Sequence, residues 1–206
     1  MKSVILDVDG TIWDTTTEVA KCWTKVINEN GIEIELSGEQ LGKLFGLPMD
    51  MLIKAILPNV PEQERMEVAE KAVTYENEHL RTAVVKPYDG VVETIKNLSE
   101  ITDVYIVSNA NSGYIESMME NLQIEKYIKD FTCYGDTGEY KDKNIQYIIE
   151  KNKISDPIYV GDTEMDRQAC KSANVPFVYA AYGLGNVKEK PDYQIQSFKE
   201  IISLIV

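Results

Sequence analysis

The sequence contains few of the side chains that most often bind transition metals. His79 is the only histidine among 206 residues, and the cysteines are limited to Cys22, Cys133 and Cys170. A single histidine excludes a histidine-rich metal site and argues against a Ser-His-Asp hydrolase. The cysteines are odd in number and far apart, which is the pattern of reduced cytosolic thiols and not of a disulfide framework or a zinc site.

Long apolar runs and an excess of positive charge are also missing. No stretch approaches the roughly 20 apolar residues of a membrane span, and residues 1–20 lack the basic and apolar regions of a signal peptide. Lys and Arg number 21 against 34 Asp and Glu, so the formal net charge is −13. This charge repels nucleic acid and anionic membranes, so we expect neither as a partner. We expect a cytoplasmic protein, with a monomer as the default state.

The most informative stretch lies at the start of the chain. Val4–Leu6 is typical of a strand buried on both faces of a parallel sheet, and Asp7-Val8-Asp9-Gly10-Thr11 follows it directly. If the strand continues through Asp9, the two carboxylates share a face, with Cα atoms roughly 7 Å apart. Taken alone, Asp-x-Asp-Gly more often forms a turn and a helix cap. The rest of the sequence must decide between these interpretations.

Two different patterns follow this stretch. Residues 14–83 contain only helical signals: a first helix that ends at Gly31, then helices predicted over Ser37–Phe45, Met49–Leu57 and Glu62 to about Leu80. From residue 87 onward, helix and strand alternate. The predicted strands of this part cover residues 103–107, 131–134, 157–160, 176–180 and 193–195, and the predicted helices cover residues 90–98, 114–122, 143–151, 164–173 and 198–205.

The alternation predicts an α/β fold with a doubly wound parallel sheet, to which Val4–Leu6 also belongs. The helical block is then an insertion directly after the acidic loop. We therefore predict a core domain formed by residues 1–14 and 84–206, and an inserted all-α domain formed by residues 15–83. Its position next to the acidic loop suits a lid over the carboxyl ends of the strands.

Polar side chains follow several of the predicted strands. Ser108 and Asn109 end the strand over residues 103–107, and Asp162 ends the strand over residues 157–160, with Asp166 four residues later. Together with Asp7 and Asp9, these aspartates would place four carboxylates at one sheet edge, which is costly unless a cation lies among them. Oxygen ligands without histidine or cysteine suit Mg²⁺. Two helix-capping aspartates are the ordinary alternative for Asp162 and Asp166.

A lysine could neutralise part of this charge. The loop Gly138–Ile145 before the predicted helix contains Lys141 and Lys143. Either lysine could reach the acidic cluster and stabilise a transferring phosphoryl group, although a solvated charged loop is the more ordinary interpretation of the segment alone.

In combination these motifs are far more specific than each is alone. Asp-x-Asp-Gly-Thr, Ser-Asn, Lys and Gly-Asp-x-x-x-Asp follow one another in chain order. The sequence thereby resembles the haloacid dehalogenase-like (HAD) superfamily of hydrolases over its whole length, including the helical insertion. The resemblance implies a Rossmann-like core with a helical-bundle cap, a small phosphorylated metabolite as substrate, and Mg²⁺ as cofactor.

The resemblance also implies residue roles. Asp7 corresponds to the nucleophile that forms an aspartyl-phosphate, Asp9 to the acid/base, and Lys141 to the lysine that pairs with the nucleophile, with Lys143 as the alternative. Mg²⁺ would be held by Asp7, the carbonyl of Asp9, Asp162 and Asp166. The residues that would face the substrate are Thr11, Ser108, Asn109 and Ala110 in the core, and Gly46 and Leu47 in the cap loop Phe45–Met49.

Within the superfamily, Asp9 argues for phosphoryl chemistry because the dehalogenases lack an aspartate there. The β-phosphoglucomutase branch has a histidine where this chain has Val19, and an arginine just after the cap-loop glycine where this chain has Leu47 and Pro48. These departures favour a phosphatase similar to phosphoglycolate phosphatases. A β-phosphoglucomutase-type phosphotransferase and a catalytically idle relative that binds a phosphorylated ligand stay open as alternatives.

Overall fold

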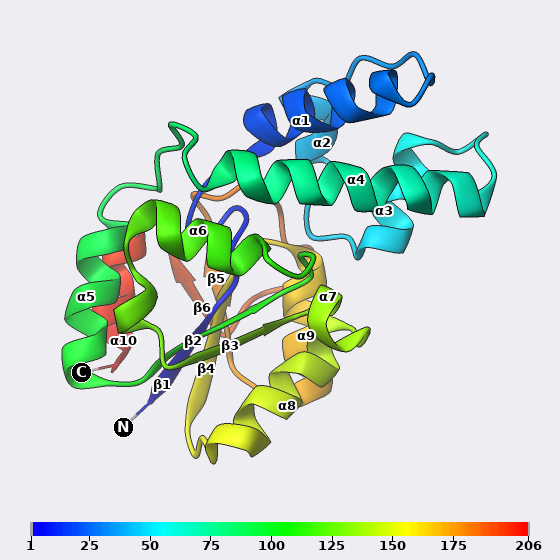
Figure 1. The fold of residues 1–206 in the computed structure, drawn as a ribbon. Helices are drawn as coiled ribbons and strands as arrows, with labels where there is room; N and C mark the ends of the chain where they lie inside the picture. Colours follow the sequence, from blue (N-terminus) through cyan, green and yellow to red (C-terminus); the bar gives the residue numbers. More distant parts are fainter. Residues whose placement is uncertain (1, 206) are drawn as a thin grey trace.

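A computed structural model describes residues 2–205 of the chain, and a six-stranded parallel sheet forms its centre (Figure 1). The strand order is β3-β2-β1-β4-β5-β6, so the strand that carries the acidic loop lies in the middle, between β2 and β4. The order reverses direction at β1, and such a switch point is where open α/β sheets bind ligands. The strands are β1 (Ser3–Leu6), β2 (Val104–Ser108), β3 (Asp130–Cys133), β4 (Pro157–Gly161), β5 (Phe177–Ala180) and β6 (Tyr193–Ile195).

The apolar runs form these strands because both faces of the sheet are covered by helices. Val4 and Leu6 belong to the apolar core on one face, and Ile5 belongs to the core on the other, which is the alternation a strand requires. One face carries α5 (Val91–Ile101), α6 (Tyr114–Leu122), the 3₁₀ segments η1 (Glu125–Tyr127) and η2 (Phe198–Ile201), and α10 (Ile202–Ile205); the other carries α8 (Lys141–Asn152) and α9 (Glu164–Ala173), and the short α7 (Tyr134–Thr137) lies after β3. The doubly wound fold predicted from the sequence is confirmed.

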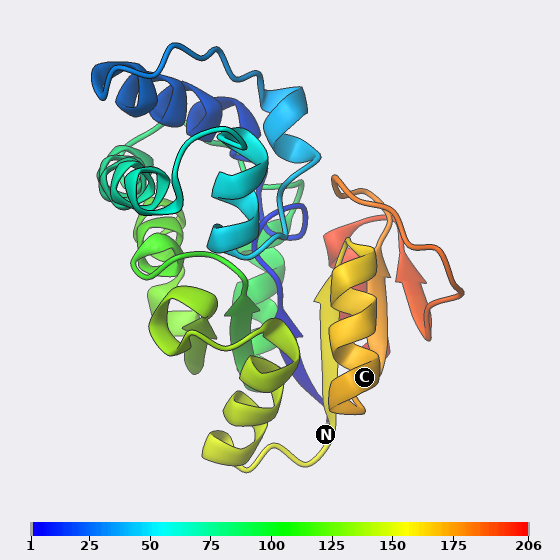
Figure 2. The same cartoon turned by 90° about the vertical axis from the view of Figure 1, so that its right-hand side faces the viewer.

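The helical block lies beyond the carboxyl ends of the strands, as Figure 2 shows from the side. It consists of α1 (Thr16–Glu29), α2 (Gly38–Gly42), α3 (Met49–Ile56) and α4 (Glu62–Leu80), of which α1 and α4 pack along each other. Residues 16–83, all within the described chain, contain no strand. The proposed division into domains at residues 14 and 84 stays a prediction.

The two connections between the sheet and the helical block lie side by side. Trp13, on the outgoing connection, forms an antiparallel bridge with Pro87 on the returning one. The amide of Tyr88 donates a hydrogen bond of 3.0 Å to the carbonyl of Ile12, and Tyr88 packs edge to face on Tyr182. Trp13 itself is fully buried. The chain therefore leaves and re-enters the sheet through one paired segment.

Several element bounds differ from the sequence predictions. β1 ends at Leu6 and does not continue through Asp9, because the chain turns into a bridge between Asp9 and Trp13. The helix predicted over residues 37–45 is limited to Gly38–Gly42, and looser turns follow it to residue 47. The helix predicted over residues 143–151 begins at Lys141. Among the helices within residues 2–205, none has the length and apolarity that crossing a bilayer requires.

Candidate active site

A buried lysine joins two aspartates near the carboxyl ends of the central strands β1 and β4. Asp7 directly follows β1, and Lys141 lies in the first turn of α8. Lys141 Nζ donates hydrogen bonds to Asp7 Oδ1 at 2.9 Å and to Asp166 Oδ1 at 2.5 Å, and all three side chains are buried. Lys143 lies on the exposed side of the same helix, where its Nζ is 3.4 Å from Gln146 Oε1. The structure therefore brings Lys141, and not Lys143, to the acidic cluster.

Three carboxylates form a compact oxygen cluster. Asp7, Asp162 and Asp166 each offer one carboxylate oxygen within 4.8 Å of the others. Asp162 Oδ2 accepts hydrogen bonds from the amides of Leu184 and Gly185, whereas Oδ1 is buried and lacks a partner among the described residues. An unpartnered buried acceptor among three acids is the arrangement that a hard divalent cation satisfies. The side chains present therefore fit a metal ion of this kind.

Asp166 also takes part in the N-terminal cap of α9. Its Oδ2 accepts hydrogen bonds from the amide and the hydroxyl of Thr163, at 2.9 and 2.6 Å, and the amide of Asp166 donates back to the Thr163 hydroxyl. This capping box starts α9 and fixes the carboxylate orientation. The ordinary capping interpretation therefore holds for one oxygen of Asp166, while the other oxygen faces Lys141.

Gly10 allows the acidic loop to pass close to this cluster. Its φ angle is +76°, and a β-carbon at this position would collide with the Asp162 carboxylate. Both the left-handed backbone and the close approach therefore require glycine.

The Asp9 side chain faces a different set of partners. Its Oδ1 accepts a hydrogen bond of 2.5 Å from the hydroxyl of Tyr114, and the Thr15 hydroxyl lies 2.8 Å from the same tyrosine oxygen. The Asp9 carboxylate does not belong to the three-acid cluster, so the expected group of four carboxylates is limited to three. The reason is the early end of β1, after which Asp7 and Asp9 no longer share the face of a strand.

Burial raises the pKa of these acids. The pKa of Asp7 rises to about 6 despite the opposing effect of Lys141, and the pKa values of Asp9 and Asp162 each rise to about 8. Burial works against the charged form of Lys141, but the carboxylates of Asp166 and Asp7 outweigh it and raise the pKa of that lysine. Asp9 is therefore protonated in much of the protein at neutral pH, the state that the acid/base role expected from the sequence requires before proton donation.

These shifts predict how stability depends on pH in the absence of a divalent cation. Between about pH 5 and pH 8, the folded Asp9 and Asp162 carboxyls hold protons that the unfolded chain has released, because their pKa values rise from 3.8 to about 8. The free energy of unfolding should therefore fall as pH rises through this window. Added Mg²⁺ binds the ionised folded cluster, so its stabilising effect should be largest near pH 8.

Thermal unfolding by circular dichroism, in EDTA and in Mg²⁺ at several pH values, measures both effects. The Asp162→Asn variant is the control, because its melting temperature should depend less on pH. A melting temperature that rises in EDTA over the same window would contradict the prediction.

The end of β2, the strand next to β1, contributes small polar groups to the site. Ser108 is the last residue of β2, and its Oγ accepts a hydrogen bond of 3.1 Å from the amide of Ala110. Asn109 Nδ2 donates a hydrogen bond of 2.7 Å to the carbonyl of Gly46 in the helical block. This bond links the core loop directly to the predicted cap loop.

A small cavity lies between the sheet edge and the helical block. Its volume is about 50 Å³, which holds only a few water-sized groups at roughly 10–15 Å³ each. The predicted site residues in its wall are Asp7, Asp9, Gly46, Leu47, Ser108, Asn109, Ala110 and Lys141. Thr11 was expected to face the substrate, but it is fully buried away from this wall, and its carbonyl accepts a hydrogen bond from Tyr182.

Tyr114 and Glu76 are among the cavity-wall residues that escaped the sequence analysis. Tyr114, in the first turn of α6, holds Asp9, and Glu76, on α4, is the only acid that the helical block contributes to the wall formed by the described residues. Tyr114 lies 105 positions from Asp9 in a helix whose pattern already explains its burial. The polar run around Glu76 is typical of a solvated helix face. Neither residue carried a signal in the sequence.

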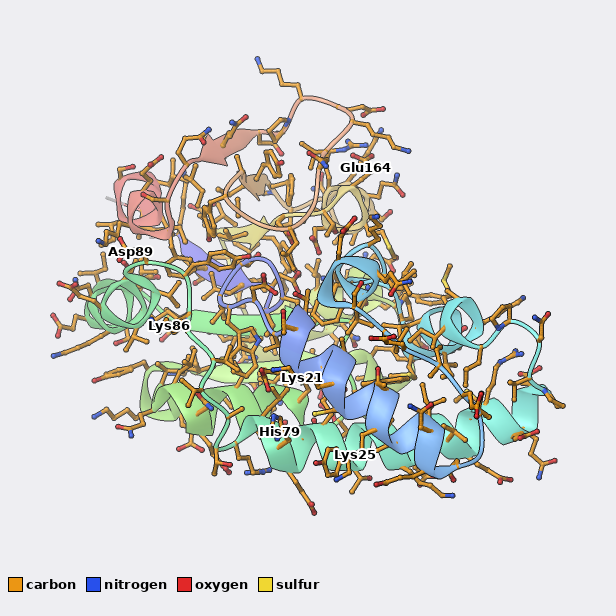
Figure 3. The ribbon with its side chains drawn as sticks, turned by 90° about the horizontal axis from the view of Figure 1, so that it is seen from above. Lys21, Lys25, His79, Lys86, Asp89 and Glu164 are labelled. Atoms are coloured by element: carbon orange, nitrogen blue, oxygen red, sulfur yellow. The ribbon has the colours of Figure 1, made fainter. Side chains whose placement is uncertain are left out.

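The single histidine is outside the cavity wall. His79 lies on α4 beside α1 (Figure 3), where its Nε2 is 3.0 Å from Glu18 Oε2 and its ring stacks on Tyr75. It therefore joins two helices of the block at the protein surface.

Comparisons with known proteins agree with this geometry. The family model of haloacid dehalogenase-like hydrolases matches residues 4–180. The phosphoglycolate phosphatase of Aquifex aeolicus (strain VF5) is 26% identical over 216 residues, which cover 100% of this chain and 97% of the relative. That of Pseudomonas savastanoi pv. phaseolicola is 24% identical over 98% of this chain and 78% of the relative. The crystal structure of a predicted phosphoglycolate phosphatase from Haemophilus somnus has the same fold, with a TM-score of 0.87 at 19% identity and coverage of 99% and 97%.

Proposed function

Because the chain belongs to the haloacid dehalogenase-like hydrolases, we propose that it is a Mg²⁺-dependent phosphatase that hydrolyses a small phosphorylated metabolite through an aspartyl-phosphate. Its place among phosphatases is supported by relatives that bear the name phosphoglycolate phosphatase and match over nearly the whole of this chain. The observation that carries the proposed mechanism is the buried lysine between Asp7 and Asp166, next to the unpartnered oxygen of Asp162.

In the first step, a carboxylate oxygen of Asp7 forms a bond to the phosphorus atom while the bond from phosphorus to the ester oxygen breaks. Asp9 gives its proton to the departing oxygen, so an alcohol leaves and Asp9 becomes a carboxylate. In the second step, Asp9 takes a proton from a water molecule that attacks the phosphorus atom. The bond to Asp7 breaks, and phosphate leaves with the Asp7 carboxylate regenerated.

The remaining groups neutralise and position the phosphoryl oxygens. Lys141 brings a fixed positive charge to Asp7 within the buried site, where its effect is strong. Ser108 and the Asn109 segment supply a hydroxyl and an amide to the same cavity wall. Asp7, Asp162, Asp166 and the carbonyl of Asp9 would hold Mg²⁺, which when bound supplies positive charge against the negative charges of phosphate and protein.

The phosphotransferase alternative has less support. A mutase of the β-phosphoglucomutase type has a histidine at the position of Val19, and in this structure Val19 supplies an apolar side chain to the cavity wall. An apolar group there cannot exchange a proton with the substrate. The monomeric state and the cytoplasmic location predicted from the sequence stay predictions.

The test is a screen of the full-length protein against a panel of phosphate monoesters that includes p-nitrophenyl phosphate, with inorganic phosphate as the measured product. We expect Mg²⁺-dependent turnover that EDTA abolishes and added Mg²⁺ restores. Conversion of β-glucose 1-phosphate to glucose 6-phosphate with a bisphosphate activator would favour the mutase instead. Mg²⁺ binding without turnover of any ester would favour a catalytically idle relative.

A further inference from the structure

The cavity wall above the reacting groups is almost entirely apolar. The helical block contributes side chains from α1, α2, α3 and the loop between α2 and α3, which are Val19, Trp23, Leu41, Phe45, Leu47, Met49 and Leu52. Among them lies one acidic side chain, Glu76 from α4. The leaving group of a bound phosphate ester would occupy this space, because the core residues hold the phosphate end. The contacts of Glu76 therefore bear on the chemistry of that leaving group.

Glu76 is buried at a position where its helix otherwise buries small or apolar side chains. It is 7% exposed, and Ala72 and Leu80, one turn away on either side, are fully buried. Its Oε2 accepts a hydrogen bond of 2.5 Å from Trp23 Nε1. No group within residues 2–205 donates a hydrogen bond to Oε1. A buried carboxylate with one donor retains acceptor capacity that an incoming group can satisfy.

The charge of Glu76 acts on the reaction centre. Its carboxylate contributes to raising the pKa values of Asp9 and Tyr114, so it lies close enough to influence both. No lysine, arginine or histidine of the described chain forms an ion pair with Glu76. Burial also raises the pKa of Glu76 itself to about 7, against the effect of Trp23. A second carboxylate brought into this cavity would meet a group that is partly ionised and has no cation beside it.

We propose that Glu76 determines the substrate class: the leaving group carries a hydrogen-bond donor, a hydroxyl or an ammonium, that Glu76 accepts, and carboxylated leaving groups are disfavoured. This inference rests on the proposed phosphatase function, since it concerns the alcohol released by the same reaction. It separates this chain from its phosphoglycolate phosphatase relatives in substrate, because phosphoglycolate places a carboxylate next to the phosphoryl oxygen.

The first experiment uses matched esters and needs no variant. Ethyl phosphate, 2-hydroxyethyl phosphate, 2-aminoethyl phosphate and phosphoglycolate differ only in the terminal group, and the three-carbon analogues extend the series by one methylene. We expect kcat/KM for the better donor ester to exceed that for ethyl phosphate by about tenfold or more, with phosphoglycolate lowest. A preference for the amine indicates an ammonium, and a preference for the alcohol indicates a hydroxyl. Phosphoglycolate as the best of the four esters would overturn the inference.

The second experiment removes the negative charge at Glu76. In Glu76→Gln we expect the ratio of kcat/KM between the donor ester and phosphoglycolate to shrink by about tenfold. Glu78→Gln is the matched control, since Glu78 is an exposed glutamate on the same helix, and it should retain the wild-type ratio. An unchanged ratio in a folded Glu76→Gln variant would overturn the role of Glu76.

The outcomes distinguish this inference from the function on which it rests. Hydrolysis of p-nitrophenyl phosphate together with a preference for phosphoglycolate would contradict the proposed role of Glu76 and support the proposed phosphatase function. Failure to hydrolyse any ester, p-nitrophenyl phosphate included, removes both. If Glu76→Gln does not fold, the ranking of kcat/KM for the four esters on the wild-type protein still tests the inference.

Discussion

The Asp7→Asn variant should lose phosphatase turnover by a factor on the order of 10⁵ or more, the magnitude that removal of a covalent nucleophile causes in other hydrolases. An asparagine amide is a poor nucleophile and cannot form the mixed anhydride that a carboxylate forms with phosphate. The substitution preserves shape, so the side chain still contacts Lys141, and the fold should persist. Phosphate release from p-nitrophenyl phosphate in Mg²⁺ measures the loss.

Asp156→Asn is the control for this change. Asp156 is an exposed aspartate directly before the amino end of β4, whereas the acidic loop follows the carboxyl end of β1. Its substitution should therefore leave turnover unchanged. Circular dichroism of both variants establishes that they are folded. If Asp7→Asn retains a tenth or more of the wild-type rate, a nucleophilic role for Asp7 is wrong.

The Lys141→Met variant should lose both activity and stability. Methionine keeps the unbranched apolar stem but leaves the buried carboxylates of Asp7 and Asp166 without their shared cation. Removing one partner of a buried ion pair typically costs about 3–5 kcal/mol. The loss of transition-state charge stabilisation should reduce kcat by about 10³-fold. Urea unfolding and phosphate release measure the two effects.

Lys143→Met tests whether position matters more than charge. Lys143 is two residues away on the exposed side of α8, so its removal should change the free energy of unfolding by no more than about 0.5 kcal/mol. Lowering the pH to about 5 should recover part of the stability of Lys141→Met, because protonation of Asp7 removes one of the uncompensated charges. Equal effects of the two substitutions would show that Lys141 has no special role.

The sequence predicts the parallel sheet and the residues at the carboxyl ends of its strands well, because both follow from local patterns. Apolar runs such as Val4–Leu6 can be buried on both faces only in a parallel sheet, and its strand ends then meet along one edge. The approach of Asp7 to Asp162 follows from that topology, and Asp166 joins them because it lies in the first turn of α9, directly after β4. The choice between Lys141 and Lys143 required the position at which α8 begins. Periodicity determines a helix start poorly when the helix opens with three charged residues, as α8 does.

Long-range contacts around the cavity could not be predicted in the same way. The hydrogen bond from Tyr114 to Asp9 and the position of Glu76 depend on how α4 and α6 pack over the sheet edge. The run around Glu76 has the polar composition of an exposed helix face, yet Glu76 is buried because Trp23 covers it. Such placements are set by tertiary packing, which one sequence does not reveal.

The paired connections at Trp13 and Tyr88 have a mechanical consequence. A single connecting segment would let the helical block rotate in any direction. Two connecting segments joined by hydrogen bonds bend easily about only one axis. We therefore expect the cavity to open by a hinge rotation of the helical block about a single axis. This rotation would break the hydrogen bond of 2.7 Å from Asn109 Nδ2 to the carbonyl of Gly46, which joins the core to the helical block at the cavity wall. The same rotation would also break the hydrogen bond of 2.9 Å that Asn77 on α4 donates to the carbonyl of Ser112 in the core.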